Sequence, residues 1–185
     1  MADQGSEGLL SPFLRKQRIK AIKPFLKGKI LDIGCGSGIL ATLVSPHLYN
    51  GVDIDITSIN QAKKNYPNHR FNSELPSDSE KFDIIVLLAT IEHVANPVEF
   101  LTNISKYLKK DPGGSIILTT PLPAFEKIYS FGVYLGLFSK HANEEHEELL
   151  CFTRLKEIAD LCNLEITLYK RFLFGANQLV SFKIK

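Results

Sequence analysis

The sequence LDIGCGSG, at residues 31–38, joins a short apolar run to three closely spaced glycines. An apolar run that stops at a glycine is typical of a buried strand, and glycines permit a tight turn whose backbone can approach a ligand. We expect a helix to follow, so that its free N–H groups and its dipole face an electron-rich or anionic group. The stretch therefore predicts a strand–turn–helix unit with a ligand at the turn; a tight turn without a ligand is the alternative.

Strand-like and helix-like segments alternate along the rest of the chain. The predicted strands are 50–54, 69–72, 82–88, 115–120, 164–172 and 176–184. The predicted helices are 9–28, 37–45, 57–65, 97–109 and 153–162. Alternation at these lengths indicates βαβ units and a parallel sheet. The last two strands have only a short connection between them, so we expect that pair to be antiparallel.

Composition restricts the possible classes of protein. The chain has 185 residues, of which 44% are hydrophobic and 23% charged. These values favour one packed domain, 1–185, and argue against a disordered or fibrous chain. A net charge of +2 does not by itself indicate a nucleic-acid partner. Three scattered cysteines, no signal-peptide pattern and no apolar run of about 20 residues favour a soluble cytoplasmic protein without a transmembrane segment.

Two aspartates near the glycines indicate the kind of ligand. Asp32 lies two residues before Gly34, where its charge would repel a pyrophosphate and attract an amino group or a sulfonium. Asp53, nineteen residues after Gly34, ends the second predicted strand and suits the two hydroxyls of a ribose. Asp55 is a second candidate, with a role at a helix start as the alternative. The spacing of Gly36, Gly38 and Ala41 also fits a loose dinucleotide pattern, so an NAD-dependent oxidoreductase stays open.

LDIGCGSG, GVDID and FDIIVLLATIEHVANP, in this order and spacing, resemble the class I S-adenosylmethionine-dependent methyltransferases. The resemblance implies a Rossmann-like, doubly wound α/β fold. Its seven-stranded sheet would be mostly parallel with a reversed C-terminal strand, in three α/β/α layers. It also implies S-adenosylmethionine as the cofactor and a methyl acceptor as the second substrate.

Individual positions carry the family's cofactor contacts over to this chain. The backbone at Gly34 and Gly36 would contact the methionine part, Asp53 the ribose, and Ile54 the adenine. Many members have an acid after the third strand for the adenine amino group, whereas this chain offers Asn72 or Ser73. The expected cofactor-binding residues are Asp32, Gly34, Gly36, Gly38, Asp53, Ile54, Asn72 and Leu88.

Glu92 and His93 are the candidate catalytic residues. His93 follows the fourth strand, where ligands of open α/β sheets bind, and could act as a base toward an oxygen nucleophile. Glu92 would orient His93 or contact the acceptor; both residues have a purely structural role as the alternative. The pair also resembles ubiquinone-type O-methyltransferases and small-RNA 3′-end methyltransferases. Some of these bind a metal through Glu-x-x-Glu-His, but Ala89 replaces the first glutamate here, so we predict no metal.

The acceptor itself is the least determined feature. Aromatic and aliphatic residues are dense in 121–150, which we expect to cover the acceptor pocket. Packing on the core and contact with a membrane surface are the alternatives. His146 with Phe152 resembles weakly a segment that closes over the acceptor in relatives. We predict a small-molecule acceptor, with apolar or lipid-linked compounds and RNA ends among the candidates, and a non-catalytic cofactor-binding module as the competing function.

Overall fold

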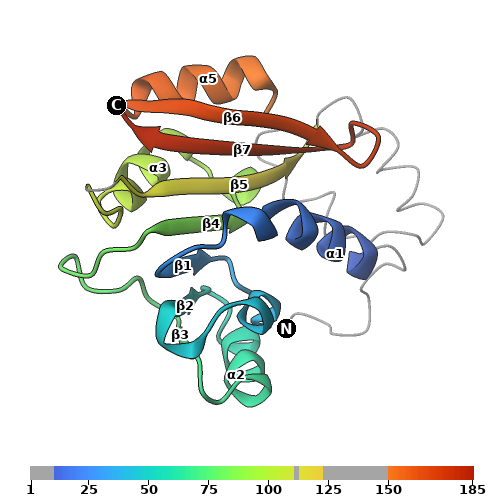
Figure 1. Ribbon diagram of the computed structural model, residues 1–185, viewed down its shortest axis with the longest axis vertical. Coiled ribbons are helices and arrows are strands. Elements are labelled where there is room, and N and C mark those ends of the chain that lie inside the picture. Colours follow the sequence, from blue (N-terminus) through green and yellow to red (C-terminus); the bar gives the residue numbers. More distant parts are fainter. Residues whose placement is uncertain (1–10, 111–112, 123–149) are drawn as a thin grey trace.

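The computed structural model describes residues 11–110, 113–122 and 150–185, and these residues form a seven-stranded sheet with helices on both faces (Figure 1). The strands are β1 (Ile30–Ile33), β2 (Tyr49–Val52), β3 (Arg70–Asn72), β4 (Ile84–Leu88), β5 (Ser115–Pro121), β6 (Leu164–Phe172) and β7 (Asn177–Ile184). They are arranged in the order β3-β2-β1-β4-β5-β7-β6. The first five strands are parallel, and β7 is antiparallel to both β5 and β6. The predicted Rossmann-like sheet with a reversed last strand is confirmed.

Two apolar clusters, one on each face of the sheet, make the three layers. The helices are α1 (Ser11–Ile22), α2 (Ile56–Asn65), α3 (Pro97–Ser105) and α5 (Phe152–Leu161). Ile22 of α1 and Ile59 of α2 pack with Ile30 and Val86 on one face. On the other face, α3 and α5 cover the alternate residues of the same strands, such as Leu31 and Ile85. The central strands bury both of their faces, which explains their nearly continuous apolar sequences.

Three predicted helices differ in detail from those in the structure. The segment predicted as helix 37–45 contains a short 3₁₀ turn, Ile39–Leu43, in place of an α-helix. A second 3₁₀ turn, Pro46–Leu48, follows it and begins at Pro46, which cannot continue a helix. The helix predicted over 57–65 begins at Ile56, and Asp55 caps it by accepting from the backbone N–H groups of Thr57 and Ser58, which is the helix-start role given above as the alternative for Asp55. The helix predicted to reach residue 109 ends at Ser105, because the chain then forms a parallel bridge between Leu108 and Phe82.

The structure describes most of the predicted N-terminal helix, 9–28, but little of the predicted acceptor cover, 121–150. Within the basic segment 9–28, the structure forms α1 and a 3₁₀ turn at Lys23–Phe25 that contains Pro24. Most of the predicted acceptor cover, residues 123–149 of 121–150, lies outside the described residues, as does His146. The cover therefore stays a prediction.

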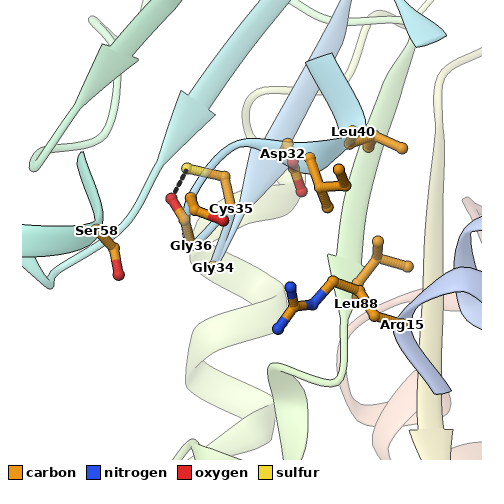
Figure 2. Close-up of a pocket in the computed structure, with 10 residues that line it drawn as sticks. Arg15, Asp32, Gly34, Cys35, Gly36, Leu40, Ser58 and Leu88 are labelled. Atoms are coloured by element: carbon orange, nitrogen blue, oxygen red, sulfur yellow. Dashed lines mark hydrogen bonds between the residues drawn. The ribbon is translucent and has the colours of Figure 1, made fainter. Parts of the chain in front are cut away.

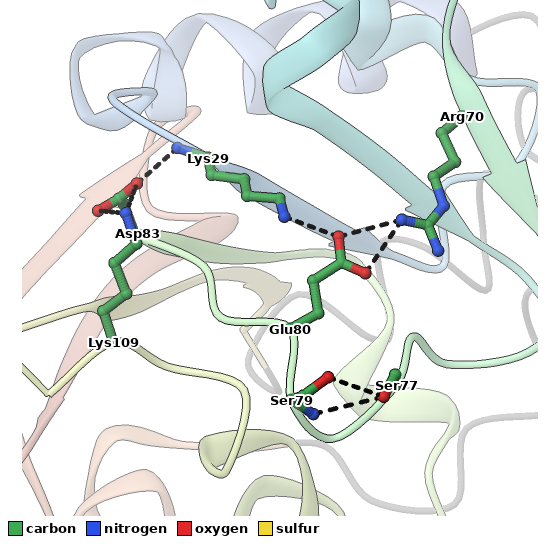
Figure 3. A network of polar contacts seen from close by, with 7 residues as sticks. All are labelled: Lys29, Arg70, Ser77, Ser79, Glu80, Asp83 and Lys109. Atoms are coloured by element: carbon green, nitrogen blue, oxygen red, sulfur yellow. Dashed lines mark hydrogen bonds and ion pairs between the residues drawn. The ribbon is translucent and has the colours of Figure 1, made fainter.

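A network of charged side chains fastens the amino ends of the strands (Figure 3). Glu80 accepts from Arg70 at 3.0 Å and forms an ion pair with Lys29 at 2.7 Å. Asp83 accepts from the Lys29 backbone N–H at 2.6 Å and from the Lys109 ammonium at 2.8 Å. This network ties the start of β1 to the start of β4, and so fixes the pair of strands whose opposite ends form the candidate site.

Candidate functional site

The carboxyl ends of β1 and β4 open into a cavity of about 430 Å³ (Figure 2). The strand order reverses at this point, because the chain runs outward from β1 to β3 and then returns to β4, and ligands of open α/β sheets bind at such a point. The described residues that line the cavity are Arg15, Asp32, Gly34, Cys35, Gly36, Ser37, Ile39, Leu40, Ser58 and Leu88. Four of the eight predicted cofactor-binding residues are among them: Asp32, Gly34, Gly36 and Leu88.

The glycine loop has the backbone that a close ligand approach requires. Gly36 has a φ of 52°, and a Cβ atom placed there would meet nothing within 4 Å, so the loop is open on the side where a ligand could approach. Gly38 has a φ of 81° and lies against the ring of Phe71, which a Cβ would approach to 2.7 Å. Gly36 therefore leaves space for a ligand, whereas Gly38 is needed for packing beneath the loop.

The two candidate acids after β2 have different partners. One oxygen of Asp53 accepts from the Gly36 backbone N–H at 2.7 Å, and the other accepts from the Asp55 N–H at 2.9 Å. Asp55 caps α2 instead, and its hydrogen bonds, the strongest from the Ser58 hydroxyl and the next from the Thr57 N–H, hold its pKa below the usual range. Asp53 is thus the acid that faces the glycine loop.

Asp32 is buried, with only 2% of its surface exposed, at the floor of the cavity. Its carboxylate accepts from the phenol of Tyr49 at 2.6 Å. Burial raises the pKa of Asp32 to about 7, the Tyr49 hydrogen bond acts against this rise, and the nearby charge of Asp53 adds to it. The site therefore contains a carboxylate that titrates near neutral pH.

The residues expected at the adenine lie beside the cavity and not in its lining. Ile54 is 92% exposed, directly after Asp53. The Asn72 carbonyl accepts from the Asp53 N–H at 3.2 Å, which joins the end of β3 to the end of β2. The Asn72 and Ser73 side chains line a neighbouring hollow between α2 and the chain after β3. Asp53 connects the glycine loop to these residues through its hydrogen bonds, although it is not itself among the described residues that line the cavity.

Glu92 and His93 lie in a 3₁₀ turn, Ile91–His93, after β4. His93 is exposed, while Glu92 is 2% exposed, and its Oε2 atom has no hydrogen-bond partner in the described part of the chain. Burial raises the pKa of the Glu92 carboxyl, against the opposing charges of Arg18 and His93. Neither residue is among the described residues that line the cavity in Figure 2. Ala89, just before this turn, has a φ of 55°, a strained conformation for a residue with a Cβ atom.

Sequence reasoning missed several residues of the cavity. Arg15 points from α1 toward the glycine loop and lines the cavity (Figure 2). Ser58 reaches the cavity from the first turn of α2, and Cys35 and Ser37 come from the loop itself. The glycine motif could have indicated Cys35 and Ser37, but no local signal marks Arg15, which is nineteen residues before Gly34.

Two further expectations concern metals and membranes. Among the residues that the structure describes, no three His, Cys, Asp or Glu side chains gather in a way that could hold a metal ion. His141 and His146 lie outside those ranges, so the prediction of a metal-free site stays a prediction. In the same ranges, no helix has the length and apolar character needed to cross a bilayer.

Known proteins are similar to this chain in sequence and in fold. A methyltransferase-domain family model matches residues 10–166. Over 106 residues, 51% of this chain, the sequence is 33% identical to a ubiquinone biosynthesis O-methyltransferase from Coxiella burnetii. Over 163 residues, 80% of this chain, it is 29% identical to the protein of that name from Rickettsia bellii. The alignments cover 44% and 65% of these two proteins, so the chain spans about half to two thirds of the length of the curated relatives it matches.

Solved structures agree on the fold. The plantazolicin methyltransferase BpumL, in complex with a triazolic desmethylPZN analogue and S-adenosylhomocysteine, superposes with a TM-score of 0.72 at 16% identity. The superposition covers 95% of this chain and 86% of that one. This superposition shows the fold, and the match of the methyltransferase family model to residues 10–166 confirms the family that the sequence motifs indicated. The chain belongs to the class I S-adenosylmethionine-dependent methyltransferases.

Proposed function

We propose that this protein transfers the methyl group of S-adenosylmethionine to an oxygen atom of a small-molecule acceptor by in-line displacement. The observation that carries the proposal is the cavity at the ends of β1 and β4, where Asp53 is bonded to the glycine loop at 2.7 Å. The ubiquinone biosynthesis O-methyltransferases among its relatives support oxygen as the methyl acceptor atom.

The residues at the site fit the chemical groups of this cofactor. The open backbone at Gly36 admits the methionine part, and the carboxylate oxygens of Asp53 suit the ribose hydroxyls. Arg15 supplies a cation for the carboxylate of the methionine part, and Asp32 an anion for its amino group. Ile54 presents an exposed apolar surface on which adenine can pack. Asn72 would bond the adenine amino group, and Gly38 and Leu88 complete the proposed cofactor set.

When bound, S-adenosylmethionine supplies an electrophilic methyl group. The chain's task is to hold the acceptor oxygen in line with this methyl group and to accept the proton that the oxygen loses. His93 is the proposed base, because it is exposed in the turn that follows β4, and the carboxyl end of β4 opens into the cavity. Glu92 is the proposed partner that holds the turn of His93 in place from the buried side. Residues 121–150 are the proposed cover of the acceptor.

Methyl transfer from labelled S-adenosylmethionine into fractionated extract, followed by mass identification of the product, tests this function. We expect a labelled small molecule with an O-methyl group, and a His93→Ala variant that binds the cofactor normally but transfers at least tenfold more slowly. Label in lipid or RNA fractions would replace the small-molecule acceptor. Cofactor binding without label in any fraction would support a non-catalytic module, and a thermal shift with NAD but not with S-adenosylhomocysteine would refute the proposal.

A further inference from the structure

Tyr49 and Asp32 form a buried hydrogen-bonded pair behind the glycine loop. The Tyr49 phenol is 3% exposed and donates to the Asp32 carboxylate at 2.6 Å. Asp32 also lines the cavity. Its carboxylate therefore has Tyr49 as a partner within the protein and can still contact a ligand in the cavity. A hydrogen bond from a neutral donor to a buried carboxylate favours its ionised form and fixes its orientation.

The strand register explains why these two side chains meet. Ile30 lies opposite Tyr49 and Asp32 opposite Gly51, so Tyr49 and Asp32 are on the same face, two positions apart. Gly51 has no side chain in between, and a Cβ there would come within 2.7 Å of Phe71. The Tyr49 ring packs edge-on against Phe71, with 5.5 Å between the ring centroids. The phenol is thereby held in one position by apolar packing.

The charged and titratable groups near the Asp32 carboxylate come from α1, from β2 and from the segments that follow β1 and β2. Tyr49 donates to it from β2, Asp53 after β2 places a second negative charge near it, and Cys35 lies on the loop after β1. Arg15 faces the same cavity from α1. Burial and the Asp32 charge raise the pKa of Tyr49 above its usual range, so the phenol keeps its proton and remains a donor between pH 6 and pH 9.

We propose that Tyr49 is a positioning residue for cofactor binding: it holds the Asp32 carboxylate ionised and oriented toward the amino group of S-adenosylmethionine. This inference rests on the proposed function, because it requires a cationic ligand in the cavity. Without the phenol, Asp32 would keep its burial and the negative charge of Asp53, both of which favour the neutral acid. A neutral Asp32 would attract a cationic amino group much more weakly.

Titration calorimetry of Tyr49→Phe and the unchanged protein with S-adenosylhomocysteine, from pH 6 to pH 9, tests the inference. We expect the variant to bind about tenfold more weakly at pH 6 and about fivefold more weakly at pH 7, with the difference vanishing by pH 9, where Asp32 is ionised in both proteins. The ratio of the two dissociation constants at each pH cancels the titration of the ligand's own amino group. A purely structural role for Tyr49 would give the same ratio at every pH, and that result would overturn the inference.

Two further sets of variants complete the experiment. Tyr49→Phe should add no loss of affinity in an Asp32→Asn background; an equal additional loss there would contradict the inference. Tyr107→Phe is the matched control, since it removes a phenol-to-carboxylate hydrogen bond to Asp78 (3.1 Å) outside the cavity lining, and its affinity should equal that of the unchanged protein.

The unchanged protein provides a test even if Tyr49→Phe does not fold. Its affinity should rise between pH 6 and pH 8 more steeply than that of Asp32→Asn, and equal profiles would overturn the inference. A failure of the unchanged protein to bind S-adenosylhomocysteine at any pH would overturn the proposed function as well, whereas binding with equal profiles overturns the roles given to Asp32 and Tyr49 and leaves the methyl transfer itself untouched.

Discussion

Asp53→Ala should separate cofactor binding from folding. The carboxylate accepts from two backbone N–H groups, those of Gly36 and Asp55, at 2.7 and 2.9 Å, and would also accept from the ribose hydroxyls. A hydrogen bond to a charged group contributes about 1.5–3 kcal/mol. Because about 1.4 kcal/mol corresponds to a factor of ten, the loss of one such contact in the complex predicts roughly 10- to 100-fold weaker binding. In the free protein, water can replace the lost oxygen at this half-buried position, so the cost to folding should be smaller.

Titration calorimetry with S-adenosylhomocysteine, together with thermal unfolding in its absence, measures both effects. The matched control is Asp55→Ala, two residues along, which removes the cap of α2. Asp55 does not itself line the cavity, and the one lining residue that loses a hydrogen-bond partner is Ser58. This control should lower Tm by roughly 2–4 °C and leave the dissociation constant within about twofold at temperatures where the protein is folded. Equal affinities for Asp53→Ala and the unchanged protein, or an equal loss in both variants, would refute the assignment of Asp53 to the ribose.

Four other substitutions give distinct results. Gly36→Ala should weaken S-adenosylhomocysteine binding more than it affects urea unfolding, because its Cβ would occupy the open space that we assign to the ligand. Gly38→Ala should lower the midpoint of urea unfolding, because its Cβ would come within 2.7 Å of the Phe71 ring. Arg15→Ala should weaken binding of S-adenosylhomocysteine in titration calorimetry but not of 5′-methylthioadenosine, which lacks the carboxylate; equal losses would contradict the proposed contact. Burial acts to raise the pKa of Asp83, yet its hydrogen bonds, chiefly from Lys109, hold it below the usual range, so this acid stabilises the fold above about pH 4 and loses that effect as the pH falls further. The Tm of Asp83→Asn should accordingly be lower than that of the unchanged protein at pH 7, and the gap should shrink toward pH 3.

The parts of the site that lie within one strand–turn–helix unit were predictable from the sequence. The three glycines of residues 31–38 needed left-handed backbone, and the structure gives Gly34, Gly36 and Gly38 φ values of 76°, 52° and 81°. Asp53 and Asp55 could not be separated in this way, because both follow the same short strand and either could face the loop. Their assignment depended on which carboxylate meets Gly36 once β1 and β2 pair, which is a contact between strands.

Residues from distant parts of the chain were not predictable. Arg15 resembles any basic residue on a surface helix, and it became part of the cavity only because α1 packs on the face of the sheet that carries the glycine loop. Tyr49 fits the pattern of a buried strand residue, and nothing local shows that its hydroxyl has a carboxylate as partner.

By itself the sequence determined the α/β class, the order of strands and helices, the reversed C-terminal pair and the glycine turn, because these follow from hydrophobic periodicity and from the backbone freedom of glycine. Only the tertiary structure decided which charges meet at the turn. Register between β1 and β2 places the Tyr49 phenol on Asp32, and helix packing places Arg15 at the same cavity. Charge and hydrogen bonding act over a few ångströms in space, and residues nineteen positions apart come that close only in the folded chain.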